Sequence, residues 1–594
     1  MFLFNIKVEE YQTFKILTKV AKISEIGAEK PMSRKINYDN WSREELIKEL
    51  RRIKETKYGL VWHRDLPEEK IDILINPDAR TPSEMFPNEM SGKPFPVLKE
   101  VKGKKIKPDK DKLMNLLIEG DNYHSLAVLN FTHQEMIDLI YIDPPYNTGN
   151  KDFIYNDSFV DREDSFRHSK WLAFMEKRLK LARNLLKKDG VLFMSIDDNE
   201  FAQLKLLTDE IFDENNFVID AIWNSRKSVS SDAIVSLNHN HTLIYAKDIN
   251  KLRESVKRGL KFKLPANEDK FSNPDNDRRG PWTPDPFEAA GVRKNLSYQI
   301  TNPNTGNVYY PVKGRHWAVL EEQYKQLLQD NRIVFGKSGK GKPQRKRFLT
   351  DAMEKGLTPK SIWDDVGTTT NGTQELENIL GEKTFNNPKP VSLIRRILEL
   401  STSKDSIVLD FMAGSGTTGH AVLKHNQNDG GNRQFILCTN NENSICTDVC
   451  YPRIKNVIKG YKNTKGENVA GLGGNLKYYT CDFVESEPTD RNKRKLVNES
   501  TEMLCIKENA FELVQDSRNF KVFKNNQKYL GIIFYEEAID DFKKAIKNIK
   551  CHFNTYVFSL GDDTHEKQFA DVFDKVTLCA IPEVILKVYR EIFK

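Results

Sequence analysis

The feature of this sequence that most constrains its fold is an alternation of short apolar runs with segments of helical length. Such runs occur at residues 116–121, 138–142, 191–197, 221–223, 241–247, 406–411 and 434–439. Buried strands that alternate with helices are typical of an α/β domain with a parallel sheet. Between about Asp248 and Ile362 the alternation stops, and Pro, Asn, Gly and basic residues become frequent. The sequence therefore predicts one α/β domain that is interrupted by an insert.

This pattern divides the chain into segments with different expected structures. Residues 1–112 are predicted to hold an N-terminal helical segment and a charged linker, with a capping box at Ser42 opening an amphipathic helix. The halves of the α/β domain are predicted at 113–247 and 363–481, on either side of the insert at 248–362. Residues 482–594 are expected to form a C-terminal α+β domain.

Composition favours a cytoplasmic protein without a membrane anchor. No apolar run approaches the roughly 20 residues that cross a bilayer, and the N-terminus lacks the pattern of a signal peptide. The seven cysteines are irregularly spaced and have no paired ligands that would complete a zinc site. We therefore expect reduced cysteines and no bound metal. The net charge of +7 permits a polyanionic partner, but the position of the positive charge matters more than its sum.

The positive charge is concentrated in the insert. Basic residues without an intervening acid lie at Arg332, Lys337, Lys340, Lys342, Arg345, Lys346 and Arg347. Within this run, residues 336–342 read GxxxxGK, but Pro343 replaces the Ser or Thr that a nucleotide-binding P-loop requires. We expect Lys340, Lys342, Arg345 and Lys346 to contact DNA phosphates, and the alternative is an ordinary solvated loop.

One predicted strand ends in Asp143-Pro144-Pro145-Tyr146. Ligands of α/β sheets bind where strands end. The Asp143 carboxylate and the carbonyls next to the prolines are acceptors, and Tyr146 offers a flat ring. Together they would bind an amino group on an aromatic ring and make its nitrogen nucleophilic. A proline turn that merely ends the strand is the alternative for the first three residues.

A second strand runs into a loop of small residues, Leu409 to Val422. Glycines at such a turn allow the backbone to approach a ligand closely. Gly414, Gly416 and Gly419 also fit the GxGxxG pattern of nicotinamide dinucleotide sites. However, no hydride-transfer site is evident, and the loop follows an earlier α/β half instead of opening the domain.

With both stretches in view, the sequence resembles the amino-group DNA methyltransferases. DPPY at 143–146 is similar to their catalytic motif, and DFMAGSGTT at 410–418 is similar to their S-adenosylmethionine loop. The order of these motifs, with an insert between them, is that of the β class. Further stretches, at 57–62, 361–365 and 385–390 and in the C-terminal segment, resemble the modification subunit of type III restriction-modification systems.

The resemblance implies an S-adenosylmethionine-dependent, Rossmann-like methyltransferase domain in permuted order, with the insert as target-recognition domain. It implies site-specific methylation of adenine N6 in double-stranded DNA by base flipping. The expected partners are duplex DNA, a second copy of the chain in a homodimer and a separate ATP-dependent restriction subunit. The expected catalytic residues are Asp143, Pro144, Pro145 and Tyr146, and the expected cofactor residues are Asp121, Lys389, Asp410, Phe411, Gly414, Gly416, Thr417 and Glu442.

Individual roles also come from the resemblance. Asp143 and the Pro144 carbonyl would bind the target amine, and Tyr146 would stack on the base. Asp121 would face the adenine of the cofactor, Lys389 its carboxylate end, and Glu442 its ribose, although Glu442 stands later than the usual acid. Three alternatives stay open, namely N4-cytosine methylation, a catalytically idle DNA-recognition subunit and a nicotinamide oxidoreductase.

Overall fold

The computed structural model describes residues 94–594 apart from short gaps, and before them Ser42, Arg43, Ile47 and Trp62. The gaps are 108, 110–111, 150–152, 156–157, 162–163, 165, 230, 232, 265–267, 337–338, 486, 526–527, 560–564, 583–584, 587–588, 590–591 and 593–594. The helix predicted after Ser42 therefore lies largely outside the described residues. No helix in the described part of the chain is long and apolar enough to cross a membrane.

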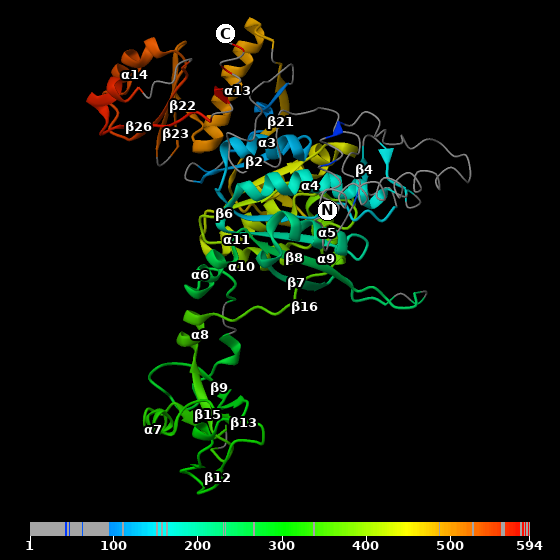
Figure 1. Cartoon of the computed structure of the whole chain (residues 1–594), viewed down its shortest axis with the longest axis vertical. Coiled ribbons are helices and arrows are strands. Elements are labelled where there is room, and N and C mark those ends of the chain that lie inside the picture. The colour runs from blue at the N-terminus through cyan, green and yellow to red at the C-terminus, as the bar shows by residue number, and fades with distance from the viewer. Residues whose placement is uncertain are drawn as a thin grey trace, which may run out of the picture. The chain divides into compact units, whose positions relative to one another are not determined.

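A ten-stranded sheet forms the centre of the α/β domain (Figure 1). Its order is β1 (Phe95–Glu100), β21 (Asn475–Val484), β2 (Met114–Glu119), β18 (Gln434–Thr439), β17 (Ile407–Asp410), β3 (Ile137–Ile142), β6 (Leu186–Ile196), β8 (His239–Ala246), β7 (Phe217–Asn224) and β16 (Ile362–Trp363). Each strand predicted from an apolar run is present. The halves that the insert separates in sequence are joined where β17 pairs with β3, so the sheet is continuous.

The prediction of a parallel sheet was wrong at two places. The central strands from β21 to β6 are parallel, but β8 is antiparallel to both β6 and β7, and β1 is antiparallel to β21. The cause at β7 and β8 is their connection, because the described residues between Ser225 and Asn238 form no helix that could carry the chain back for a parallel pairing.

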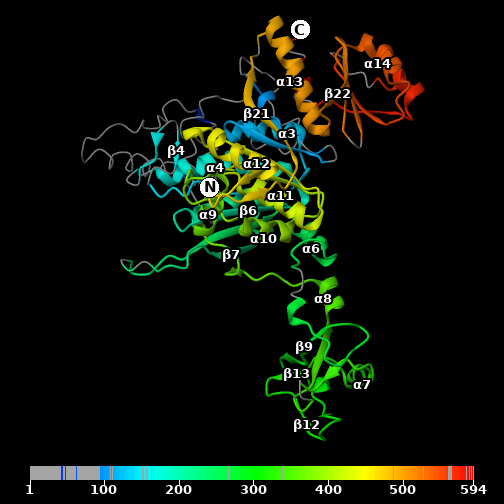
Figure 2. The same cartoon turned by 180° about the vertical axis from the view of Figure 1, so that it is seen from behind.

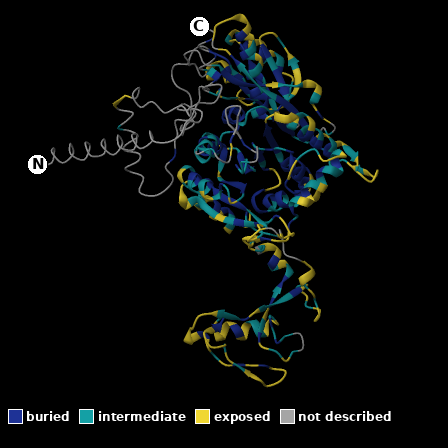
Figure 3. Ribbon diagram, turned by 90° about the vertical axis from the view of Figure 1, so that its right-hand side faces the viewer, coloured by how far each residue is buried: buried dark blue, intermediate teal, exposed yellow. Residues whose placement is uncertain are grey.

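Helices cover the sheet in two groups. The first comprises α3 (Asn122–Thr132), α4 (Arg167–Leu185) and α5 (Phe201–Phe212), which pack side by side. The second comprises α6 (Ile249–Lys257), α9 (Thr369–Leu380), α10 (Val391–Ser401), α11 (Thr417–Asp429) and α12 (Tyr451–Lys459). Leu139 and Tyr141 of β3 belong to the core of the second group. Their neighbours Ile140 and Ile142, equally buried, point to the opposite face because side chains alternate along a strand. Figure 3 shows the buried residues concentrated in these layers.

The insert begins later than the sequence indicated. In α6, Leu252 belongs to the hydrophobic core between the sheet and the second group of helices. Ser255 Oγ of the same helix donates to Asp189 Oδ2 at 2.8 Å. Leu264 and Leu357 then exchange two backbone hydrogen bonds, of 2.9 and 2.8 Å, so the chain leaves and returns at adjacent points.

Between these points the insert has a hydrophobic core of its own. The core is formed by Phe287, Ile300, Trp317, Tyr324, Ile333 and Phe335. The insert's elements are β9 (Trp282–Pro286), β10 (Glu288–Ala290), β11 (Ile300–Thr301), β12 (Val308–Tyr309), β13 (Arg315–Trp317), α7 (Glu321–Gln329), β14 (Ile333–Val334), β15 (Gln344–Phe348) and α8 (Leu349–Lys355). The insert is therefore a folded region, although its sequence lacks regular periodicity.

The C-terminal segment combines helices and a second sheet. β21 belongs to the central sheet, and α13 (Asp490–Glu508) packs on β1 and α3. Beyond it, β22 (Glu512–Asp516), β23 (Phe520–Lys524), β24 (Tyr529–Ile533), β25 (Phe553–Val557) and β26 (Val576–Leu578) form a five-stranded sheet. This sheet and α14 (Ile539–Ile546) share a separate hydrophobic core. Figure 2 shows the sheet and α14 as a region drawn in red and orange.

Candidate active site

Two cavities meet at Asp143. The smaller has a volume of about 400 Å³ and the larger about 1370 Å³. Both lie where strands of the central sheet end, as expected for an α/β fold. The residues that border both cavities are Asp143, Pro145, Phe385, Glu442, Asn443 and Ile445. A ligand in one cavity can therefore reach a ligand in the other past the Asp143 carboxylate.

The turn after β3 is held rigidly by its neighbours. Asn147 is fully buried with φ at +55°, and its side-chain amide donates to Glu200 Oε1 at 2.5 Å. Trp171 Nε1 donates to the Pro145 carbonyl at 2.7 Å. The Pro144 carbonyl accepts no hydrogen bond from the described residues, so it is an available acceptor beside the Asp143 carboxylate.

The two oxygens of Asp143 have different surroundings. Oδ2 is 2.5 Å from Lys389 Nζ, whereas Oδ1 is buried and makes no hydrogen bond with the described residues. Lys389 Nζ also lies 5.1 Å from the centre of the Tyr146 ring. Burial, followed by the nearby Asp143 charge, raises the pKa of Tyr146 well above its usual range, so its hydroxyl stays neutral. One carboxylate oxygen is thus fixed by a cation and the other remains available to a donor.

Asp410 holds the glycine loop (residues 409–422) in place by hydrogen bonds from the protein interior. The side chain is 2% exposed, and burial raises its pKa to about 7. It accepts hydrogen bonds from the Met412 amide at 3.0 Å and from Thr418 Oγ1 at 2.5 Å. Asp410 therefore connects the end of β17 to the first turn of α11 and does not border either cavity.

The glycines of this loop serve different purposes. Gly414, with φ at +49°, borders the smaller cavity. Gly416 has φ at +77°, and a Cβ on it would stand 3.0 Å from Cys450 Sγ, which is inside the protein. Gly416 thus allows α11 to pack against the core, whereas Gly414 brings backbone to the cavity surface.

The predicted cofactor residues therefore fall into two groups. Asp121, Phe411, Gly414 and Glu442 border the smaller cavity. The others do not border the smaller cavity. Asp410, Gly416 and Thr417 face the protein interior, and Lys389 borders the larger cavity. Thr417 Oγ1 accepts a hydrogen bond from the buried Arg453 at 2.7 Å. Asp121 caps α3 by accepting from the Tyr123 amide at 2.6 Å, and it pairs with Arg178 at 3.2 Å.

The predicted catalytic residues are brought together. Asp143, Pro144, Pro145 and Tyr146 all border the larger cavity. The sequence did not single out the other residues of the two walls, among them Phe153, Phe174, Phe385, Asn443, Asp198, Trp223, Arg226 and His239. Most of them belong to loops or strand ends and follow no motif. Phe385 is the exception, because it begins the stretch 385–390 that was already singled out by its resemblance, although no role was assigned to it.

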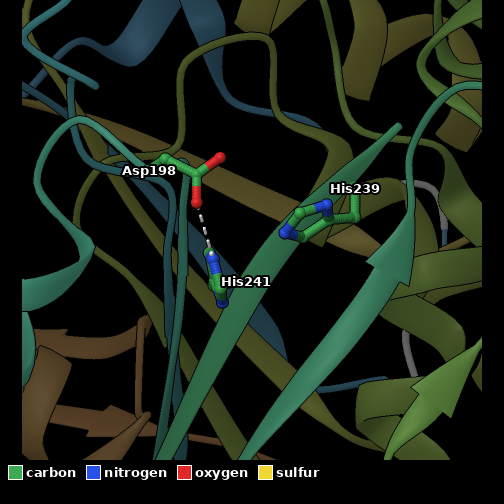
Figure 4. A group of neighbouring side chains, drawn as sticks. All are labelled: Asp198, His239 and His241. Atoms are coloured by element: carbon green, nitrogen blue, oxygen red, sulfur yellow. Dashed lines mark hydrogen bonds and ion pairs between the residues drawn. The ribbon is translucent and has the colours of Figure 1, made fainter. Parts of the chain in front are cut away.

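Asp198, His239 and His241 form a cluster beside the larger cavity (Figure 4). His241 Nδ1 is 2.8 Å from Asp220 Oδ2, and Nε2 is 3.2 Å from Asp198 Oδ1. Burial lowers the pKa of His241, but its bonds to Asp220 and Asp198 outweigh burial and raise it. Both ring nitrogens of His241 therefore face carboxylates, which fixes the orientation of the ring beside the cavity wall.

The basic run of the insert is only partly available to a polyanion. Lys340, Lys342 and Arg345 are exposed. Lys346 is 1% exposed, and its ammonium binds Asp275 and, at 2.9 Å, Asp277. The prediction that Lys346 contacts DNA phosphate was therefore wrong, because its charge is neutralised inside the insert.

The comparisons with known proteins agree with this architecture. The family model N6_N4_Mtase, described as DNA methylase, matches residues 137–450, which is more than half of the chain. The chain belongs to this DNA methylase family. The matched region of the methylase begins at β3 and includes both the DPPY turn and the glycine loop.

Several curated proteins are similar to this methylase. It is 40% identical to the StyLTI Mod subunit of a type III restriction-modification enzyme from Salmonella typhimurium, covering 55% of this chain and 52% of that protein. It is 31% identical to the EcoPI Mod subunit from Escherichia phage P1, covering 64% and 68%. It is 32% identical to the type II methyltransferase M.KpnI from Klebsiella pneumoniae, covering 56% and 82%.

The match to the Salmonella protein thus spans about half of that relative's length. Among solved structures, the cytosine-N4-specific PvuII DNA methyltransferase aligns with the methylase at a TM-score of 0.28 and 14% identity, covering 55% of this chain and 84% of that chain.

Proposed function

We propose that this chain methylates adenine N6 at a specific site in duplex DNA, with S-adenosylmethionine as methyl donor, as the modification subunit of a type III restriction-modification system. The observation that carries the proposal is that two acceptors without a hydrogen-bond partner among the described residues, Asp143 Oδ1 and the Pro144 carbonyl, belong to adjacent residues on the wall of the larger cavity, where Asp143 also borders the smaller one. Two acceptors and the Tyr146 ring suit an aromatic amine. Membership of the DNA methylase family supports the reaction class.

The smaller cavity suits the methyl donor. Its wall combines the rings of Phe153, Phe174, Phe385 and Phe411 with the carboxylates of Asp121 and Glu442. Aromatic side chains would enclose the adenine, and the carboxylates would accept hydrogen bonds from its amino group and from the ribose hydroxyls. S-adenosylmethionine supplies an electrophilic methyl group on a sulfonium.

The larger cavity would receive the target base. A stacked adenine cannot bring its amine to Asp143, so the base must leave the duplex. Asp143 Oδ1 and the Pro144 carbonyl would each accept one amine hydrogen, which directs the nitrogen lone pair out of the ring plane. Positioning the nitrogen in line with the donor contributes much of the acceleration in such reactions. The proton released after transfer would leave through the Asp143 carboxylate.

The decisive experiment is single-molecule methylation sequencing of DNA from cells that express the protein. We expect N6-methyladenine at one short motif that is absent when Asp143 is replaced. N4-methylcytosine instead would establish the alternative base, since the matched family model covers both reactions by its name. Unmethylated DNA would leave the idle recognition subunit as the better explanation.

The proposed assembly also needs separate tests. Relatives named as Mod subunits of type III restriction-modification enzymes support a restriction partner. Its ATP dependence and the homodimer rest on the family resemblance alone. Light scattering on the purified chain would measure its oligomeric state. Co-purification with a restriction subunit from the native host would test the partner.

The first prediction concerns Gly414. Because Gly414 borders the smaller cavity, Gly414→Trp should fill that space and weaken S-adenosylmethionine binding by more than about 100-fold, as measured by calorimetry. Gly414→Ala adds only a methyl group at a positive φ and should lose at most about 30-fold in affinity, since such strain costs about 1–2 kcal/mol. Equal affinity of wild type and the Trp variant would exclude this cavity as the cofactor site.

The second prediction concerns the exposed basic residues of the insert. Replacing Lys340, Lys342 and Arg345 with Ala should weaken binding to all DNA sequences, because phosphate contacts carry no sequence information. The slope of log affinity against log salt should flatten by roughly 0.9 for each lost phosphate contact. DNA binding at several salt concentrations measures both effects.

Lys346→Ala is the matched comparison. It leaves Asp275 and Asp277 without their shared cation, so we expect a lower melting temperature and little change in the salt slope. A salt slope unchanged in the triple variant would show that the run is an ordinary solvated loop. A changed methylation motif would show that these side chains contact bases.

A further inference from the structure

The loop between β7 and β8 carries apolar side chains that contact almost nothing. Over residues 225–238, Val229 is 78% exposed, Ile234 105%, Val235 76% and Leu237 63%. Isolated apolar residues are common on protein surfaces, but several on one loop mark an interaction site. The loop is also longer than the two to five residues that usually join antiparallel strands, and it projects beyond β7 in Figures 1 and 2.

The two ends of this loop form part of the wall of the larger cavity. Ser225, Arg226, Leu237, His239 and Asn240 all border the cavity that contains Asp143 and Tyr146. The exposed apolar tip is therefore continuous in sequence with the wall of the proposed base pocket. A nucleic acid that places a base beside Asp143 would therefore also contact this loop.

Hydrogen bonds hold the two ends of the loop in place. The Arg226 amide donates to the Asn238 carbonyl at 3.1 Å, and Asn238 Nδ2 donates to the Arg226 and Ser228 carbonyls. From α9, Thr369 Oγ1 donates to the Ser225 carbonyl at 2.8 Å. Because these hydrogen bonds hold both ends of the loop in place, the loop can insert its apolar tip between stacked bases without changing its own conformation.

Charge identifies the kind of partner. Arg226 and Lys227 are exposed at the base of the loop, next to the apolar residues. Basic side chains beside apolar wedges are the combination with which proteins bind phosphates and separate base steps in DNA. A hydrophobic protein surface would not need the cations, whereas a duplex uses both features.

We propose that the loop at residues 225–238 inserts Val229, Ile234 and Val235 into the duplex at the space that the flipped adenine vacates. This proposal rests on the proposed function, because it assigns the loop to the base-flipping step of that reaction. Arg226 and Lys227 would contact the flanking phosphates. The apolar side chains would replace the stacking that the base loses when it leaves.

The test compares two duplexes that contain the mapped recognition site. In one the target adenine is paired with thymine, and in the other it faces an abasic position, which lowers the cost of extrusion. The variant is V229S/I234S/V235S. The control is L513S/V514S, which changes two apolar residues of β22 that are 47% and 43% exposed.

We expect the loop variant to methylate the paired duplex about tenfold or more slowly than wild type, and the abasic duplex within about twofold. With 2-aminopurine at the target position, its fluorescence increase on binding should be smaller than for wild type. The control variant should match wild type on both duplexes.

Other outcomes overturn the proposal. Equal loss on both duplexes would mean that the loop supports the catalytic site or the fold, and no loss on either would mean that it has no part in extrusion. A change of oligomeric state in the loop variant alone would assign the loop to contacts between copies of the chain. Wild-type protein that methylates neither duplex would refute the proposed function itself, and this is distinguishable from a defect in the variant alone.

Discussion

Asp143→Asn is expected to reduce methyl transfer by at least about 100-fold while leaving S-adenosylmethionine affinity within about threefold. The substitution keeps the shape of the side chain but removes the charge that accepts a hydrogen from the target amine through Oδ1. The smaller cavity, which we propose to hold the cofactor, keeps its other walls, among them the glycine loop and the residues after β18. Transfer of tritiated methyl groups and calorimetry measure the two quantities separately.

A matched control is Asp198→Asn, which changes another carboxylate on the wall of the same cavity. We expect a much smaller loss there, because Asp198 pairs with His241 and not with the amine. Wild-type rates for Asp143→Asn would remove the central residue of the proposed mechanism. Loss of cofactor binding in the same variant would place Asp143 chiefly in the cofactor site.

Lys389→Met is expected to lower kcat by about 10- to 100-fold, with a smaller effect on cofactor affinity. The ammonium holds Asp143 Oδ2 at 2.5 Å and thereby keeps the carboxylate oriented with Oδ1 available. Lys389 also borders the larger cavity and not the smaller one. Methionine keeps the length of the side chain but removes its charge.

Two comparisons distinguish this role from a structural one. Lys389→Arg should restore part of kcat because a cation returns beside Asp143. Lys383→Met changes an exposed lysine on the same cavity wall and should match wild type. The family resemblance instead assigns Lys389 to the carboxylate end of the cofactor. That role predicts a large rise in the dissociation constant of S-adenosylmethionine with a modest change in kcat.

Much of the α/β domain could be predicted because its strands are buried on both faces. Such strands appear in the sequence as apolar runs. The residues just after them, such as Asp143 and Phe411, lie at the edge of the sheet where ligands of α/β folds bind. The direction of a strand does not appear in a run of this kind. The antiparallel β8 was therefore missed, and only the lack of a helical pattern in the connection at residues 225–238 indicated it.

The misassigned lysine shows a second limit. Arg345, Lys346 and Arg347 look alike in sequence, but β15 points alternate side chains to opposite faces. Lys346 therefore turns inward to Asp275 and Asp277, about seventy residues away in the chain. Contacts of this kind depend on tertiary folding, as does the position of Asn443 on the cavity walls, and no local spacing reveals them.

The adjacent ends of the insert have a consequence for how such proteins diversify. Because Leu264 and Leu357 are joined by backbone hydrogen bonds, the region between them is attached to the rest of the chain at essentially one point. Its core is built from its own residues. A segment attached in this way can be exchanged as a cassette, since domains with neighbouring ends are readily inserted and replaced. Under the target-recognition role that the resemblance implies for the insert, such an exchange would give a lineage a new DNA target by recombination within one gene, while the cavities around Asp143 stay unchanged.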